Sequence, residues 1–295
     1  MKRERGASRG SRPPRRESRG GTLYVVGTPI GNLEDVTLRA LRVLAEVDVI
    51  AAEDTRVTRK LLARHEIHSR LISYHRHSPA RRRDEILGRL ERGEDVALVS
   101  DAGMPGIADP GHDLITACIA AGCDVVPIPG PTALATSLVV SGLPTDGFTF
   151  AGFLPRVRSR RRDALRELAG EPRTLVLFES PHRLVTTLET ALEVLGDRRA
   201  AVVRELTKTF EEVLRGPLSE ITETLRRREV IGEVTVLIAG AQPDTGEPPA
   251  MEEAIAGVER LVEADTSMRD AVRTVAQETG LSRRALYEQV QRRRR

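Results

Sequence analysis

Aromatic residues are scarce in this 295-residue chain. It contains no Trp, and only 3% of its residues are aromatic, so any core must consist of Leu, Val, Ile and Ala. The two cysteines, Cys118 and Cys123, lack the spacing of metal ligands and are interpreted as core residues. No apolar run approaches the roughly 20 residues of a membrane-spanning helix, and no apolar stretch follows the N-terminal charges as in a secretory signal. We therefore expect a cytoplasmic protein with no membrane partner.

Lysine is nearly absent too, because 43 of the 46 basic residues are arginine. A GC-rich genome would produce this bias without any functional cause, and the net charge of +3 is modest for a nucleic-acid binder. Residues 1–21 are mostly Arg, Gly, Ser and Pro and are expected to form a disordered basic tail. That tail is either a solvated leader or a non-specific phosphate contact.

From Thr22 onward, short apolar runs alternate with amphipathic stretches, which indicates strands alternating with helices in a mostly parallel sheet. We assign residues 22–145 to an N-terminal α/β domain, ending in a Pro-containing connection at 143–147. The predicted strands are 23–26, 47–51, 71–74, 96–99 and 125–128, and the predicted helices are 38–45, 59–65, 81–92 and 114–121.

A second α/β domain is predicted for residues 146–241. A Pro/Gly-rich linker at 242–250 and a helical C-terminal domain at 251–295 follow it, with predicted helices at 252–263, 268–277 and 283–291. The turn between the last two helices is compatible with a helix-turn-helix-like unit. In the second domain the predicted strands are 148–154, 174–178, 201–204 and 234–239, with an antiparallel strand at 211–214, and the predicted helices are 161–169, 184–195 and 218–227.

Three loops rich in Gly and Pro follow predicted strands of the first domain. They comprise residues 27–32, 100–111 and 129–132. Ligands of open α/β sheets bind at the carboxyl ends of strands, where Gly permits close backbone approach and Pro fixes loop shape. None of the loops matches the G-x-G-x-x-G or Walker patterns, which disfavours a dinucleotide fold or a P-loop NTPase.

Polar clusters also follow strands. The pair His75 and His77 lacks a carboxylate or Cys ligand to complete a metal site, and we expect no metal. Asp54 or Thr55 is expected to cap the helix that follows. The clusters are Ala52–Arg56, Ser73–His75, Phe178–Arg183 and Arg204–Lys208.

The ordered set of motifs resembles the ribosomal RNA small subunit methyltransferase I family of the tetrapyrrole methylase superfamily. The resemblance covers roughly residues 22–240, and the helical C-terminal part is similar to that family's small C-terminal domain. The motifs that carry it are Thr28-Pro-Ile-Gly-Asn32, Ala52-Glu-Asp-Thr-Arg56, Ser73-Tyr-His75, Ser100-Asp-Ala-Gly-Met-Pro-Gly-Ile-Ala-Asp-Pro-Gly111, Pro129-Gly-Pro131, Glu179-Ser-Pro-His-Arg183 and Glu205-Leu-Thr-Lys208.

The resemblance implies two α/β domains of tetrapyrrole methylase type, S-adenosyl-L-methionine (SAM) in the cleft between them, and a homodimer. The implied reaction is methylation of the ribose 2′-oxygen of a cytidine in the decoding region of 16S ribosomal RNA, free or in the small ribosomal subunit. Met104 and Ala108 stand where relatives often carry hydroxyl residues, which weakens the case for side-chain contacts there. Thr132 replaces a common Ser and keeps the hydroxyl.

The expected chemistry needs a group that accepts the ribose proton. Asp101 is the first candidate, with Glu53 and His75 as weaker ones, although Asp101 could equally brace its loop by accepting backbone hydrogen bonds. We expect the cofactor to contact a set of rim residues, namely Pro29, Ala102, Gly103, Ile107, Thr132, Ala133, Phe178 and Glu233.

Two rival interpretations remain open at this point. A tetrapyrrole (corrinoid) C-methylase would share the superfamily, although the Arg-rich ends and the helical C-terminal domain suit RNA better. A non-enzymatic RNA-binding or ribosome-assembly factor could keep the fold, but it would not need an intact cofactor rim.

Overall fold

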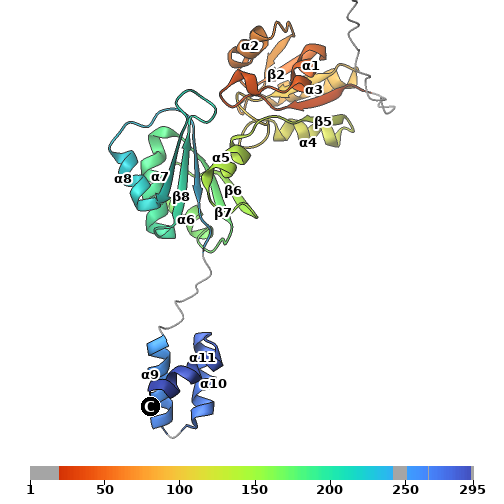
Figure 1. The fold of residues 1–295 in the computed structure, drawn as a ribbon. Coiled ribbons are helices and arrows are strands. Elements are labelled where there is room, and N and C mark those ends of the chain that lie inside the picture. The colour runs from red at the N-terminus through yellow and green to blue at the C-terminus, as the bar shows by residue number, and fades with distance from the viewer. Residues whose placement is uncertain (1–19, 242–250, 265, 294–295) are drawn as a thin grey trace, which may run out of the picture. The chain divides into compact units, whose positions relative to one another are not determined.

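The computed structural model describes residues 20–241, 251–264 and 266–293. These residues form two compact units that divide after Gly240, an α/β unit with two sheets and a helical unit (Figure 1). Most of the expected basic tail and the expected linker at 242–250 lie outside the described residues. Among the described helices, none is long and apolar enough to cross a bilayer.

The first sheet is wholly parallel, with strand order β3-β2-β4-β1-β5. Alternate residues of each strand enter two separate cores, so helices cover both faces, as parallel sheets require. Helices α3 and α4 pack on one face, and α1 and α2 on the other. The elements are β1 (Thr22–Val26), α1 (Leu38–Glu46), β2 (Val49–Ala52), α2 (Thr55–Arg64), β3 (Leu71–Ser73), α3 (Ala80–Glu91), β4 (Val96–Val99), α4 (His112–Ala120), β5 (Asp124–Ile128) and α5 (Ala133–Ser141), with a short 3-10 helix η1 (Leu33–Asp35).

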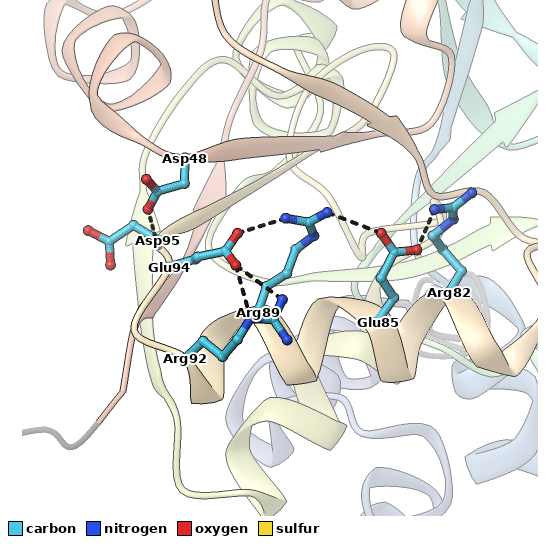
Figure 2. A network of polar contacts seen from close by, with 7 residues as sticks. All are labelled: Asp48, Arg82, Glu85, Arg89, Arg92, Glu94 and Asp95. Atoms are coloured by element: carbon cyan, nitrogen blue, oxygen red, sulfur yellow. Dashed lines mark hydrogen bonds and ion pairs between the residues drawn. The ribbon is translucent and has the colours of Figure 1, made fainter.

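The amino ends of these strands are joined by polar contacts. Asp95, just before β4, accepts a hydrogen bond from the backbone N–H of Thr22 at 2.8 Å, and its own N–H donates to Asp48 at 2.7 Å. Figure 2 shows Arg89 of α3 between Glu94 and Glu85, at 2.7 and 3.3 Å. These contacts link the amino ends of the strands and stabilise the sheet there. The carboxyl ends of the strands, on the opposite side, remain available for ligands.

The second sheet is mixed, with strand order β6-β7-β10-β8-β9 and only the β6–β7 pair parallel. The predicted antiparallel strand exists as β9. Helices α6, α7 and α8 pack on one face through a Leu-rich core. The elements are β6 (Phe148–Phe153), α6 (Arg158–Glu167), β7 (Thr174–Glu179), η2 (Pro181–Arg183), α7 (Leu184–Leu195), β8 (Arg199–Arg204), β9 (Glu212–Pro217), α8 (Leu218–Arg226) and β10 (Val234–Ile238).

Helix α5 connects the two halves of the α/β unit. Although it follows the last strand of the first sheet, it packs on β8, β9 and β10 of the second (Figure 1). Its Leu138 joins Ile30 and the inner residues Val176, Val203 and Leu237 in a shared core. Both halves thus bury apolar surface in one cluster, and this fixes the rim of one sheet against the face of the other.

The C-terminal unit consists of three packed helices, α9 (Met251–Glu263), α10 (Met268–Thr279) and α11 (Arg283–Arg293). The side chain of Ser267 caps α10 by accepting from the N–H of Asp270, and Gly280 ends it with a φ of 70°. Apolar residues at helical spacing form the core of this unit, as the sequence pattern predicts.

The predicted fold class is confirmed; the predicted strands and helices differ from the observed ones at their ends, and η1, α5 and η2 had no predicted range. The strand predicted at 47–51 begins at Val49, because Val47 ends helix α1 by donating its N–H to Val43. The helix predicted at 59–65 begins four residues earlier at Thr55, because the Asp54 side chain accepts from the N–H of Arg56 and caps it. Capping thus shifted both boundaries.

Candidate functional site

The strand order makes the three Gly/Pro loops neighbours. They follow β1, β4 and β5, which lie side by side in the sheet as β4-β1-β5. Glu53 follows β2, the next strand beyond β4. Since parallel strands present their carboxyl ends at one edge, the loops and Glu53 meet at a single rim.

Direct backbone contacts join these loops. Thr28 and Gly103 exchange two backbone hydrogen bonds, of 2.9 and 3.1 Å, and the Thr28 hydroxyl donates to the carbonyl oxygen of Ser100 at 3.2 Å. A Cβ on Gly27 would lie 2.8 Å from the Gly130 backbone, so these glycines allow the first and third loops to touch. The rim is therefore a preformed surface of closely packed backbone.

A cleft of about 430 Å³ opens at this rim. That volume lies within the range of small-molecule sites, and its lining combines apolar side chains with a few polar groups. Both sheets contribute, the first through its three loops and the second through β6, β7 and the start of β10. The lining residues are Ile30, Glu53, Asp101, Ala102, Gly103, Met104, Ile107, Asp109, Thr132, Ala133, Phe153, Phe178, Glu179, Ser180, Pro181, Gly232, Glu233, Val234 and Thr235.

Most of the residues singled out from the sequence line this cleft. Two do not: Pro29 is buried beside Ile30, and His75 lies on the exposed turn after β3, where its Nδ1 accepts the backbone N–H of His77 at 3.1 Å. The His75 contact belongs to the turn itself, which leaves the ring outside the cleft. The predicted residues that the structure brings together there are Glu53, Asp101, Ala102, Gly103, Ile107, Thr132, Ala133, Phe178 and Glu233.

Asp101 braces the rim. Its carboxylate accepts the backbone N–H of Asp54 at 2.9 Å, and its own N–H donates to Glu53 at 3.4 Å. Burial raises the pKa of Glu53, and the negative charge of Asp101 adds to that rise. The alternative interpretation of Asp101, as a group that holds its loop, therefore has a direct structural basis.

Asp109 is the carboxylate that the sequence analysis did not single out. It lines the cleft with Glu53 and Asp101, and burial, reinforced by the charge of Glu53, raises its pKa to about 6. The signal in the sequence was its position in the loop 100–111, but that loop is long and only folding shows that its far end returns to the cleft. Across the described residues, no group of three or more His, Cys, Asp and Glu is placed to hold a metal ion.

The motif Glu205–Lys208 joins the two halves beside the cleft. The Thr207 hydroxyl accepts the N–H of Asn32 at 3.0 Å, and a Cβ on Gly31 would lie 2.8 Å from the Leu206 carbonyl oxygen. Lys208 forms ion pairs with Glu205 at 2.9 Å and with Glu233 at 3.3 Å. This motif therefore holds the first loop against the second sheet and positions Glu233 at the cleft.

The motif Glu179–Arg183 is mainly structural. The buried Glu179 carboxylate accepts hydrogen bonds from the Ser180 N–H at 2.7 Å, the Thr187 hydroxyl at 2.7 Å and Arg183 at 2.9 Å. The same Arg183 nitrogen donates to the carbonyl oxygen of Leu154 at 2.8 Å. A buried charge is thereby fully paired, and the end of β7 is tied to the segment that follows β6.

Comparisons with known proteins agree with this geometry. Residues 22–222 match the family model of the Tetrapyrrole (Corrin/Porphyrin) Methylases. Ribosomal RNA small subunit methyltransferase I of Halalkalibacterium halodurans is 45% identical, over 90% of this chain and 93% of that protein. The protein of the same name from Thermotoga maritima is 48% identical over its whole length, which corresponds to 75% of this chain.

A solved structure with the same fold is uroporphyrin-III C-methyl transferase from Thermus thermophilus complexed with S-adenosyl homocysteine. It is 23% identical, with a TM-score of 0.53, and the match covers 75% of this chain and 97% of that one. At this level of identity the likeness shows the fold alone. The resemblance inferred from the motifs is confirmed, and the chain belongs to the tetrapyrrole methylase family and, within it, to the ribosomal RNA small subunit methyltransferases I.

Proposed function

We propose that this protein is a SAM-dependent methyltransferase that methylates the ribose 2′-oxygen of a cytidine in the decoding region of 16S ribosomal RNA. The observation that carries the proposal is the cleft, where Glu53, Asp101 and Asp109 of the first sheet lie among preformed backbone loops. Its homodimeric state and cytoplasmic location stay predictions.

The cleft residues fit SAM. Ile30, Ile107 and Val234 offer apolar surface for an adenine ring, and Thr132 and the acidic residues offer partners for hydroxyl and ammonium groups. Gly103, with a φ of 79°, presents backbone to the cleft where a Cβ would meet only ordinary contacts with Ile30 and Pro131. When bound, SAM supplies an activated methyl group.

The protein must then orient the ribose hydroxyl and accept its proton. Asp109 is best suited to accept it, because a carboxyl with a pKa of about 6 is ionised at neutral pH yet more basic than an ordinary carboxylate. Asp101 is committed to the Asp54 N–H and holds the loop that carries Asp109. Glu53, whose pKa is also raised, keeps negative charge beside Asp109 and so sustains its basicity.

The names of the relatives support the choice of substrate over the two rivals. The relatives that are 45–48% identical are named ribosomal RNA methyltransferases, whereas the tetrapyrrole methylase of known structure is 23% identical. A non-enzymatic assembly factor would have no use for an acidic cleft with a carboxyl of raised pKa. A target nucleotide would have to leave its stack to enter the cleft.

The test is methyl transfer from labelled SAM to small ribosomal subunits and to free 16S rRNA from cells that lack this gene, followed by mapping of 2′-O-methyl positions. We expect one modified cytidine. A chelator should not abolish the methyl transfer, provided that a control shows that the RNA stays folded. Tight SAM binding without any transfer to RNA would favour the tetrapyrrole C-methylase. Absence of SAM binding by calorimetry would favour the assembly factor.

A further inference from the structure

Three of the five phenylalanines in this aromatic-poor chain form one cluster, and two of them, Phe153 and Phe178, line the cleft. The ring of Phe178 lies 4.9 Å from that of Phe150 and 5.8 Å from that of Phe153, both in edge-to-face contact. Phe150 packs into the shared core, whereas Phe153 lines the cleft with 54% of its surface exposed. An exposed Phe ring lacks the favourable free energy of apolar burial. A flat apolar partner that covers the Phe153 ring would supply it.

A β-bulge points Phe153 into the cleft. Phe150 pairs with Val176, but an extra residue before Gly152 shifts the register so that Phe153 pairs with Phe178. Without that residue Phe153 would pair with Glu179, whose side chain lies against α7 on the opposite face of the sheet. Gly152 takes a φ of 61°, which a residue with a side chain adopts only at a cost.

A run of arginines follows directly after Phe153. Five of the seven residues from 156 to 162 are arginine, and we call Arg156, Arg158 and Arg160 the arginine arm. All three are exposed. Arg158 lies 3.6 Å from Glu193, whereas Arg156 and Arg160 form no ion pair within the described part of the chain. Two positive charges without an ion-pair partner among the described residues therefore follow Phe153 within seven positions of the chain.

Two arginine side chains hydrogen-bond to backbone carbonyl groups between Phe153 and the arginine arm. Arg183 donates to the carbonyl oxygen of Leu154, and the buried Arg161 donates to that of Arg156 at 3.5 Å. Pro155, between these two anchors, restricts the backbone further. The backbone between Phe153 and the arginine arm is thus fixed in the absence of a ligand, which lowers the entropic cost of binding.

We propose that Phe153 and the arginine arm form the subsite that receives the target nucleotide, with the base stacked on Phe153 and the flanking phosphates held by Arg156 and Arg160. A stacking ring next to unpaired cations is the pattern by which proteins hold single-stranded nucleic acid. The inference rests on the proposed function, because it places the nucleotide in the same cleft as the carboxylates. The first sheet then supplies the reaction centre and the second sheet the RNA contact.

The experiment measures affinity for single-stranded oligocytidylate and for a 16S rRNA fragment of the decoding region, alongside SAM affinity by calorimetry. Phe153→Ala should weaken RNA binding about tenfold or more and leave SAM affinity within about twofold, and Phe153→Trp should restore RNA binding. Phe148→Ala is the matched control, since Phe148 is 42% exposed at the far end of the same strand. It should change neither affinity.

An abasic nucleotide at the target position provides a stricter test. If the base stacks on Phe153, the wild type and Phe153→Ala should bind the abasic fragment equally, because the contact is already absent. The double variant Arg156→Gln and Arg160→Gln should weaken binding of both fragments and reduce the salt slope by about 1.4, for two phosphate contacts on a single strand. Arg166→Gln, later on α6, is the control for charge.

The proposal is overturned if Phe153→Ala leaves RNA affinity unchanged, or weakens binding of the abasic fragment equally. It is also overturned if the main loss is in SAM affinity, since the ring would then pack on the cofactor. These failures are separable from failure of the proposed function. If the wild type transfers methyl groups but Phe153→Ala does not change RNA affinity, only the proposed subsite is rejected. If RNA affinity depends on Phe153 but no methyl group is transferred, only the proposed reaction is rejected.

Discussion

The two sheets of the α/β unit contribute different chemistry to one cleft. The first is parallel and covered by helices on both faces, so the carboxyl ends of its strands are where its loops can meet a ligand. It contributes Glu53, Asp101, Asp109 and glycine-rich backbone. The second is mixed, and its edge strand β6 brings Phe153 to the cleft. We therefore expect that the part built by the first sheet and the part that carries Phe153 can be altered separately.

The largest expected effect comes from Asp109 in the acidic part. Asp109→Asn should lower kcat about 10²- to 10⁴-fold, because it removes the carboxylate that we propose accepts the ribose proton. In the wild type, kcat should rise with pH through about 6 as Asp109 ionises, and the variant should lose that rise. Single-turnover methylation across pH 5–8 measures both.

Asp101→Asn is the comparison within the same loop. It should weaken the bracing contact with Asp54 and leave the pH dependence near 6 in place. If instead Asp101→Asn abolishes that dependence and Asp109→Asn retains activity, Asp101 and not Asp109 is the proton acceptor.

The preformed backbone is tested by Gly103→Val. A β-branched residue is strained at a φ of 79°, and its methyl groups would extend into the cleft, so SAM affinity should fall about tenfold or more. The control is Gly122→Val, where φ is 72° and no heavy atom lies within 4 Å of an added Cβ. Both variants should lose similar thermal stability, but only Gly103→Val should lose SAM binding by calorimetry.

A smaller effect concerns stability. Because the folded pKa of Asp109 is raised from 3.8 to about 6, the folded state binds more protons between these pH values, and the free energy of unfolding falls as pH rises through this window. Asp109→Asn removes that loss, so the variant should be more stable than the wild type by on the order of 1–3 kcal/mol at pH 7.5. The advantage should vanish near pH 3.5 in urea titrations.

The smallest effect is expected from the ends of the chain. Removing residues 1–19 and everything after Ala241 should weaken RNA binding only several-fold and make its salt dependence shallower, because fewer counterions are released. SAM affinity should stay constant, and a thermal melt must show that the α/β unit is intact. A truncated protein that binds RNA as tightly, with the same salt slope, would place the whole RNA surface on the two sheets.

Most of the strands and helices, and the rim loops, could be predicted from the amino-acid pattern. Apolar runs and helical spacing indicate which segments become strands and helices, because this periodicity is present within each short segment of the chain. Loops rich in Gly and Pro after β1, β4 and β5 indicated a ligand site, since ligands of open α/β sheets bind at the carboxyl ends of strands. Even the antiparallel strand β9 could be expected from its pattern.

Which of these residues lie together became apparent only from the folded chain. Strand order made the three loops adjacent, and folding of the loop 100–111 brought Asp109 back to Glu53 and Asp101, where burial raises its pKa. The same folding left His75 on an outer turn. Likewise, one extra residue in β6 turned Phe153 toward the cleft. Solvation, charge proximity and strand register depend on residues far apart in the chain, so no local pattern could reveal them.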